Sequence, residues 1–151
     1  MRKIRKVEEG DIQKVVDIEL ESLGPVYDSE DIDFERDRLK KYLREFMDMD
    51  RMILIEDEDE ILGFLHSRSY DDVVSGKKIR EILTITIHPE YFGEGLGKEL
   101  MEYERKDAKK SNCDVLKLEV LSSNERAIEF YEERGFDEKK KIMTDEISKD
   151  K

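Results

Sequence analysis

Two kinds of hydrophobic periodicity divide this chain of 151 residues into helices and strands. Apolar residues at helical spacing predict helices over residues 12–23, from about 34, over about 95–110 and over 124–134. Short apolar or alternating runs predict strands over residues 4–7, 52–56, 61–70, 80–87, 114–121 and 136–143. Gly24 and Pro25 break the first helix, and Gly135 stands where a left-handed residue ends the last one.

The order of these elements predicts an α/β (α+β) fold in a single domain over residues 1–151. Its centre is expected to be a mixed sheet of six or seven strands, flanked by about four helices on both faces. The strands that end near Ile87 and Leu121 are expected to be parallel neighbours, because a helix connects them. In such a sheet a ligand binds at the carboxyl ends of the parallel strands.

The charge balance narrows the classes of ligand. The chain has 28 basic and 40 acidic residues, a net charge of −12, which argues against a nucleic-acid partner. It favours a cationic substrate such as an amine, although a well-solvated acidic surface has the same composition. The single Cys113 excludes an internal disulfide framework. With no signal peptide and no apolar run of ~20 residues, we expect a cytoplasmic protein without membrane contact.

A glycine loop is the first motif that carries chemistry. Residues 88–98 read HPEYFGEGLGK, follow the apolar run 83–87 and precede a predicted helix. Glycines let the backbone approach a ligand closely, and the free N–H groups of the first helical turn then face an anion such as phosphate. A simple turn before a helix is the alternative. A P-loop is excluded by spacing, because Phe92 and Glu99 stand where that motif needs Gly and Ser or Thr.

A second motif, NERAIEFYEERGF over residues 124–136, follows the predicted strand 115–120. The two motifs, in this order and separation, resemble the GNAT superfamily of acyl-CoA-dependent N-acetyltransferases. The resemblance is strong over residues 79–136, and residues 4–12 also look like the first strand and turn of that family. It implies a GNAT-like mixed sheet and one N-acetyltransferase domain that uses acetyl-CoA as cosubstrate and no metal. It also implies direct attack of an amine on the thioester in a ternary complex.

The resemblance assigns the binding of acetyl-CoA to particular positions of this chain. The glycine loop would hold the pyrophosphate with backbone N–H groups, and the preceding strand would hold the pantetheine arm by main-chain hydrogen bonds. Phe92 stands where the family usually has Arg or Gln, and Lys98 supplies a charge nearby. The implied binding residues are Ile85, Thr86, Ile87, Phe92, Gly93, Glu94, Gly95, Leu96, Gly97, Lys98, Asn124 and Tyr131.

Tyr131 and two carboxylates are the implied catalytic residues. In the family, the tyrosine that matches Tyr131 protonates the leaving thiolate, and a phenol with a pKa near 10 is protonated at pH 7. Simple packing under a helix is the alternative. Glu119 lies five residues before Asn124, a spacing that resembles the ribosomal-protein alanine N-acetyltransferase branch, in which the equivalent glutamate is the general base. Glu81 on the preceding strand is the rival base, and His88 is a weaker one.

The acceptor is predicted only as a class. The acidic segment 27–33 lies where the family admits its acceptor, so Tyr27 and Glu119 are expected to contact it. An α-amine with a pKa near 8 is neutral in roughly a tenth of molecules at pH 7, whereas a lysine amine is neutral in roughly one of 2,500. This difference favours an α-amine, and peptide N-termini, small amines and polyamines all remain candidates.

One residue departs from the alanine N-acetyltransferase branch: Leu121 replaces the arginine that this branch usually carries. A strand-completing homodimer is also compatible with the sequence. The alternative function is a non-catalytic acyl-CoA-binding or interaction domain, which Phe92 supports. His66 and Cys113 have no predicted partner, and no cluster has metal-ligand spacing.

Overall fold

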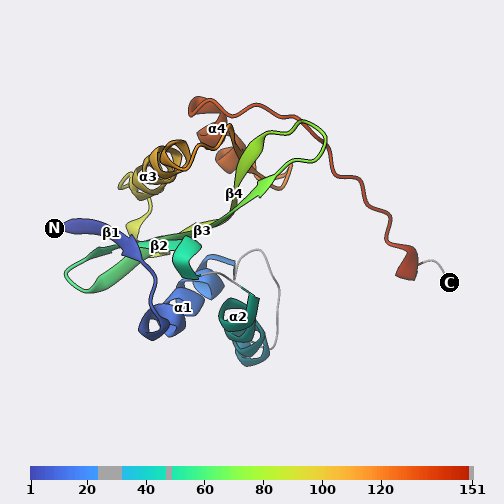
Figure 1. The fold of residues 1–151 in the computed structure, drawn as a ribbon. Helices are drawn as coiled ribbons and strands as arrows, with labels where there is room; N and C mark the ends of the chain where they lie inside the picture. Colours follow the sequence, from blue (N-terminus) through green and yellow to red (C-terminus); the bar gives the residue numbers. More distant parts are fainter. Residues whose placement is uncertain (24–31, 47–48, 150–151) are drawn as a thin grey trace. The chain divides into compact units, whose positions relative to one another are not determined.

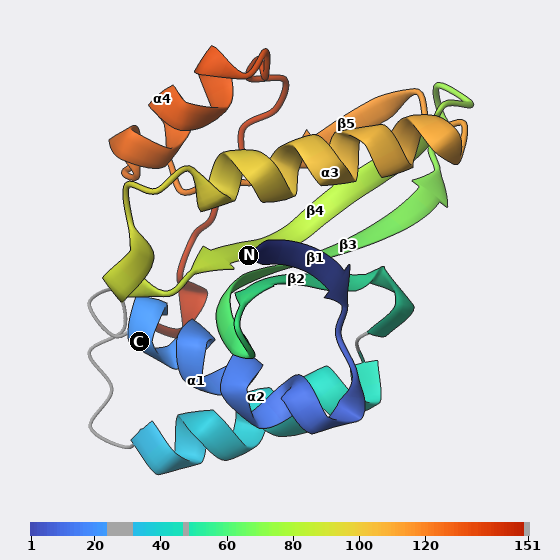
Figure 2. The same ribbon diagram turned by 90° about the vertical axis from the view of Figure 1, so that its left-hand side faces the viewer.

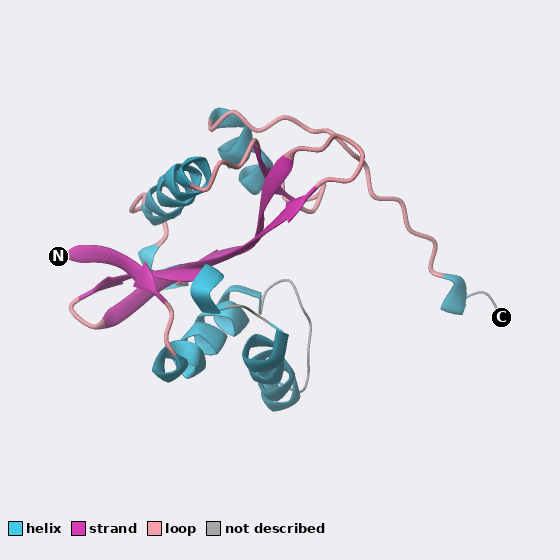
Figure 3. Ribbon diagram, in the orientation of Figure 1, coloured by secondary structure: helices cyan, strands magenta, loops and turns pink. Residues whose placement is uncertain are grey.

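The computed structural model describes residues 1–23, 32–46 and 49–149 of the chain (Figures 1 and 3). They form two compact units, Met1–Glu119 and Val120–Lys151. The first unit contains β1 (Arg2–Lys6), α1 (Ile12–Leu23), α2 (Ile32–Phe46), β2 (Met52–Asp57), β3 (Glu60–Asp71), β4 (Lys78–Ile87), α3 (Leu96–Lys110) and β5 (Val115–Leu118). The second unit contains α4 (Glu125–Glu133). None of the helices in these ranges is long and apolar enough to span a bilayer.

The five strands of the first unit form one mixed sheet in the order β1-β2-β3-β4-β5. The first three pairings are antiparallel, and β4 pairs with β5 in parallel. The predicted mixed sheet and the predicted parallel pair are therefore confirmed. In the second unit, Gly135 has a φ of 92°, and the N–H of Phe136 donates to the carbonyl of Tyr131 at 3.1 Å. This left-handed residue ends α4, as predicted.

The expected number of strands was too high. The sheet has five strands rather than six or seven, and the strand predicted over residues 136–143 is not formed, because residues 137–146 have no regular structure. Residues 137–141 are all charged, and every side chain of residues 137–146 is exposed. Such a segment has no apolar face to bury, and strand propensity alone does not stabilise it. The last strand is also shorter than the predicted residues 114–121.

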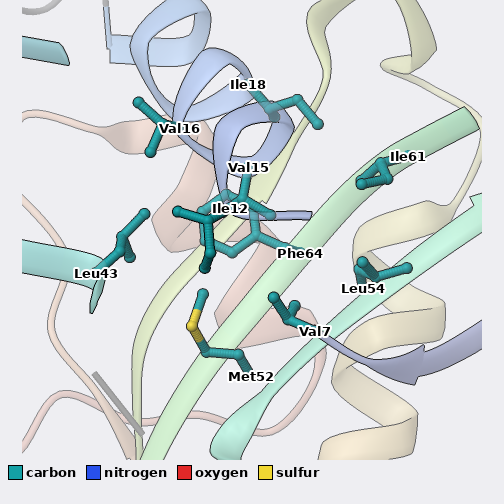
Figure 4. Packing of buried hydrophobic residues seen from close by; sticks show 10 residues of the cluster. All are labelled: Val7, Ile12, Val15, Val16, Ile18, Leu43, Met52, Leu54, Ile61 and Phe64. Carbon is teal, nitrogen blue, oxygen red and sulfur yellow. The ribbon is translucent and has the colours of Figure 1, made fainter. Parts of the chain in front are cut away.

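The sheet has helices on both faces in the first unit. Figure 2 shows α1 and α2 on one side of β1–β4 and α3 on the other. Between the sheet and α1 lies a continuous apolar cluster, to which α2 contributes Leu43 (Figure 4). From β2 it receives the alternate side chains of Met52 and Leu54, and from β3 the side chains of Ile61 and Phe64. Its members are Val7, Ile12, Val15, Val16, Ile18, Leu43, Met52, Leu54, Ile61 and Phe64.

A buried cation attaches β4 to α3 on the other face. The side chain of Arg80 is 1% exposed, and its guanidinium lies 2.8 Å from Glu104 and 2.8 Å from Asp107. It also donates to the hydroxyl of Ser69 at 2.7 Å. Glu104 accepts a further hydrogen bond from Ser67 at 2.6 Å, so both buried charges have several polar partners. This network fixes α3 over the strands that carry the predicted site.

Replacing Glu104 by Ala should lower the free energy of unfolding by about 3–5 kcal/mol, because the charge of Arg80 would stay buried with one partner fewer. Urea denaturation followed by circular dichroism measures the loss. Asp107→Ala is the matched control: its carboxylate contacts the same guanidinium but is 46% exposed, so a loss of about 1 kcal/mol or less is expected. Equal losses in the two variants would contradict this ranking.

Candidate functional site

One edge of β4 is left without a neighbouring strand at its carboxyl end. The parallel ladder with β5 stops at the pair Ile82 and Leu118, although β4 continues to Ile87. Opposite β3, the register shifts at Leu83, which makes a bulge in β4. Bulges bend a strand and end pairing, and they are frequent next to active sites. The strand therefore leaves the ladder where the sequence predicted a ligand.

The backbone of Ile85 and Ile87 points to this open edge. The N–H of His88 donates to the carbonyl of Leu62 on β3 at 2.8 Å. Successive residues of a strand direct their backbone groups to opposite sides, so Thr86 also pairs with β3 while Ile85 and Ile87 face away from it. The carbonyl of Ile87 accepts a hydrogen bond from the hydroxyl of Ser22 at 3.2 Å. The end of α1 thus lies beside the open edge.

The glycine loop has the backbone conformation that an anion site needs. After a 3₁₀ turn at Pro89–Tyr91, Gly93 and Gly95 have φ values of 85° and 78°, in the left-handed region. Gly95 is the N-cap of α3, and a Cβ added at Gly93 or Gly95 would meet no non-neighbouring atom within 4 Å. Across the described residues, no backbone N–H from Gly93 to Lys98 has an acceptor outside the helix. These donors, at the positive end of a helix dipole, fit a phosphate group.

The side chain of Arg2, on β1, contacts the glycine loop and the first turn of α3. Its guanidinium lies 3.1 Å from the carboxylate of Glu94 and 3.0 Å from that of Glu99, and it donates to the Glu94 carbonyl at 3.4 Å. It therefore balances two acidic side chains next to the unpaired N–H groups of the loop. Phe92 is 56% exposed and brings no charge to this place. The electrostatics of the loop depend on Arg2 and Lys98.

The two carboxylates that the sequence singled out as bases differ in their contacts. Glu81 is buried, and its carboxylate lies 2.6 Å from Arg68 and 3.7 Å from Lys117. Both cations hold it in place. Glu119 is exposed, directly after the last residue of β5. The hydroxyl of Tyr70, together with the carboxylates of Glu81 and Glu119, raises the pKa of Lys117.

A third carboxylate, Glu19 of α1, was missed by the sequence reasoning. It accepts a hydrogen bond from the hydroxyl of Thr86 at 2.6 Å, and burial raises the pKa of its carboxyl. It lines a cavity of about 70 Å³ together with Leu39, Tyr42, Leu43, Phe64 and Thr84. A signal for it was present in the sequence. Glu19 follows Val15 and Val16 by four and three positions, so the helical pattern places a charge on the apolar stripe.

In the second unit, Asn124 is the N-cap of α4, as predicted: its side-chain oxygen accepts from the N–H of Ala127 at 3.2 Å. The ring of Tyr131 packs edge-on against Phe130 and Phe136, with centroids 5.4 and 5.8 Å away. Burial raises the pKa of the Tyr131 phenol, so it stays protonated at neutral pH. Tyr27 lies outside the described residues.

His88 and Cys113 have structural contacts. His88 accepts from the N–H of Glu90 at 3.1 Å, and its other ring nitrogen lies 3.2 Å from Glu21. The sulfur of Cys113 lies 4.0 Å from the Ser69 hydroxyl. Within residues 1–23, 32–46 and 49–149, no three His, Cys, Asp or Glu side chains are grouped in a way that could hold a metal ion.

Comparison with known sequences shows which protein family the chain matches. The sequence model of the acetyltransferase (GNAT) family matches residues 13–136. An uncharacterized N-acetyltransferase of Archaeoglobus fulgidus is 31% identical over 132 residues, which cover 85% of this chain and 88% of that protein. The [ribosomal protein bS18]-alanine N-acetyltransferase of Escherichia coli is 39% identical over 57 residues, 38% of each chain. This partial match fits the branch that the spacing of Glu119 resembled.

Solved structures show the same fold. A proposed acetyl transferase from Pyrococcus furiosus superposes with a TM-score of 0.79 at 22% identity, covering 96% of this chain and 99% of that one. Glucosamine-6-phosphate N-acetyltransferase from Arabidopsis thaliana gives a TM-score of 0.66 at 25% identity, covering 96% and 97%. The α/β fold predicted from the motifs is confirmed by these likenesses.

Replacing Arg2 by Gln should weaken the binding of acetyl-CoA by about three- to fivefold, the size of effect typical of a partly exposed ion pair. The reason is that Glu94 and Glu99 would then repel the phosphates. Isothermal titration calorimetry measures the affinity, and the loss should shrink at high salt.

The double variant Arg2→Gln/Glu94→Gln should recover most of that affinity. Lys3→Gln is the matched control, because Lys3 is a cation of the same strand that pairs with Glu56 instead. If Arg2→Gln and Lys3→Gln bind acetyl-CoA equally well, Arg2 has no electrostatic role at the loop.

Proposed function

This chain belongs to the acetyltransferase (GNAT) family and is an acyltransferase, and on that premise we propose that it acetylates a primary amine. The acetyl donor is acetyl-CoA, which the family uses as cosubstrate, and the acceptor is a peptide N-terminus, a small amine or a polyamine. The observation that carries this proposal is the open edge of β4 beside a loop of unpaired N–H groups. An extended, amide-containing arm with a phosphate group at one end matches both features.

These features support the following residues as the ones that would hold acetyl-CoA. The N–H groups between Gly93 and Lys98 would bind the pyrophosphate, and the backbone of Ile85 and Ile87 would pair with the pantetheine amides. Asn124 uses its side-chain oxygen as the N-cap, so its amide nitrogen is left for the cosubstrate. The bound cosubstrate supplies a thioester whose acetyl carbon is open to attack by an amine.

The proposed reaction is a direct attack without an acyl-enzyme. The amine nitrogen forms a bond to the acetyl carbon, and the bond from that carbon to sulfur breaks. A backbone N–H near Ile87 stabilises the negative charge on the carbonyl oxygen in the transition state. Tyr131, protonated at neutral pH, donates its proton to the departing thiolate.

A carboxylate on the acceptor side removes the proton of the amine. Of the two predicted bases, the contacts favour Glu119 over Glu81, because Arg68 and Lys117 already occupy the carboxylate of Glu81. An incoming ammonium group would have to displace these cations. The E. coli relative acts on the alanine of a ribosomal protein, which supports a peptide N-terminus among the acceptors, and the net charge of −12 supports cationic acceptors in general.

The second candidate function is an acyl-CoA-binding domain without turnover. It is favoured by one observation, the exposed Phe92 where the family usually carries Arg or Gln. The two functions differ in a simple assay, because both predict binding of acetyl-CoA and only one predicts release of free CoA in the presence of an amine.

Replacing Tyr131 by Phe should lower kcat for acetyl transfer by about 100-fold while the affinity for acetyl-CoA stays the same, because only the donated proton is lost. Thiol release in the presence of a panel of amines and peptides measures kcat, and calorimetry measures the affinity. Phe130→Leu is a matched control on the same helix, with its ring in contact with Tyr131.

Two outcomes would contradict the proposal. Unchanged kcat in Tyr131→Phe would remove Tyr131 as the acid. Wild-type protein that binds acetyl-CoA but releases no thiol with any amine would favour the acyl-CoA-binding domain.

A further inference from the structure

The strongest feature that the proposed function does not use is the pair formed by Glu19 and Thr86. Glu19 lies on the face of α1 that also carries Ile12, Val15 and Val16, all of which are fully buried. A carboxylate at such a position loses hydration, and this loss disfavours its charged form. Thr86 gives it a hydrogen bond of 2.6 Å. Within the ranges that the structure describes, no basic side chain forms an ion pair with Glu19.

The position of Thr86 connects this pair to the proposed thioester site. Thr86 lies between Ile85 and Ile87, whose backbone groups face the open edge of β4. Its side chain points to α1 and away from α3, because alternate side chains of a strand lie on opposite faces. Through Thr86, Glu19 therefore contacts β4 at the residue between Ile85 and Ile87, whose backbone would hold the acetyl group.

The cavity beside Glu19 has the chemistry of an amine-binding site. Its volume is about 70 Å³, and its lining combines one carboxylate and the Thr84 side chain with Leu39, Leu43, Phe64 and Tyr42. Tyr42 is 44% exposed, so the cavity lies near the surface. Since a water molecule takes roughly 30 Å³ in the liquid, the space suits an ammonium group with one or two methylene groups. One Glu19 oxygen binds Thr86, and the other is left to accept from an ammonium.

We propose that Glu19 binds the ammonium group of the acceptor and removes its proton, and that the cavity selects the unbranched aminomethyl end of an alkylamine. The inference rests on the proposed acetyl transfer; it narrows the acceptor to an alkylamine and assigns the base to Glu19 in place of Glu119. The ammonium gives one proton to Glu19, the neutral nitrogen attacks the acetyl carbon, and the bond from that carbon to sulfur breaks. Tyr131 protonates the sulfur, and the second proton of the nitrogen leaves to solvent, from which Tyr131 is reprotonated.

The titratable groups around Glu19 are compatible with its assignment as the base. Tyr42 faces it from α2, and His66 of β3 lies on the same face, opposite Thr84 in the register. Further along that face, Glu81 is paired with Arg68 and Lys117. Burial raises the pKa of Glu19, and the only opposing cause is the hydrogen bond from Thr86. A carboxylate with a raised pKa holds a proton more readily at neutral pH, which suits a general base.

The central experiment compares pH profiles of kcat/KM with n-butylamine as acceptor. In wild type, activity should fall at acidic pH as Glu19 becomes protonated. Glu19→Gln, which keeps the shape and accepts the bond from Thr86, should lose about 100-fold at pH 7. Its pH profile should lack the fall at acidic pH. Its kcat/KM should recover as the pH approaches the pKa of the amine, where neutral amine becomes abundant. Thr86→Val removes the bond that lowers the pKa of Glu19, so the acidic limb should move to higher pH.

Three comparisons make the experiment decisive. Asp17→Asn, on the same helix but paired with Arg36, should match wild type. Wild type should prefer n-butylamine over an alanine-terminated tripeptide. Calorimetric titration of n-butylamine into protein saturated with CoA should show binding in wild type and its loss in Glu19→Gln, a readout that does not depend on turnover.

Each contrary result has its own meaning. Equal profiles for wild type and Glu19→Gln, or equal binding of n-butylamine by both, would overturn the inference and leave acetyl transfer intact. Loss of the acidic limb in Glu119→Gln alone would return the base to Glu119. Preference for the peptide would overturn the acceptor class. Binding of n-butylamine through Glu19 without any thiol release would overturn the proposed function and leave only the binding site.

Discussion

The early end of the ladder between β4 and β5 is the constraint on which the site depends. A backbone N–H or C=O that is paired within a sheet has nothing to offer a ligand, and an unpaired one must find a partner. Because pairing stops at Ile82 and Leu118, the backbone of Ile85 and Ile87 is released. The bulge at Leu83 makes this release local, since the antiparallel ladder with β3 continues on the other side of the strand. The glycine loop then begins at the end of the same strand.

Local charge, rather than net charge, explains how so acidic a chain could offer the proposed anion site. At physiological salt the Debye length is about 8 Å, so only charges near the loop act strongly on a phosphate there. Arg2 binds both nearby carboxylates, Glu94 and Glu99, and Lys98 lies on the first turn of α3. The remaining acidic residues lie mostly on the solvated surface, where they are screened and can still favour a cationic acceptor.

The sequence predicted the parts of the structure that depend on local pattern. Helices with an apolar stripe, the parallel pair joined by a helix, the glycine loop and the Asn124 cap all follow from spacing and turn chemistry. Contacts between distant residues carry no such pattern. The pairing of Glu81 with Arg68 and Lys117 and the reach of Arg2 to Glu94 needed the sheet register. The strand expected over residues 136–143 failed because charged residues left it no face to bury. Glu19 was visible in the sequence pattern as a charge on an apolar stripe. Its proposed role rests on the hydrogen bond that it accepts from Thr86, which only the structure shows.

Glu19 is a feature that stability alone does not explain. A carboxyl group whose pKa is raised by folding stabilises the folded protein only in its neutral form, so stability falls as the pH rises through that raised pKa. A neutral or apolar residue would serve the core better at pH 7, and such costs concentrate at functional positions. In the proposed reaction, the two sides of one strand have separate tasks. The backbone of Ile85 and Ile87 would face the thioester, and the side chains of Thr84 and Thr86 would face the acceptor. Both reactants would then meet at β4, whose position is fixed on one face by α1 and on the other by Arg80 and α3.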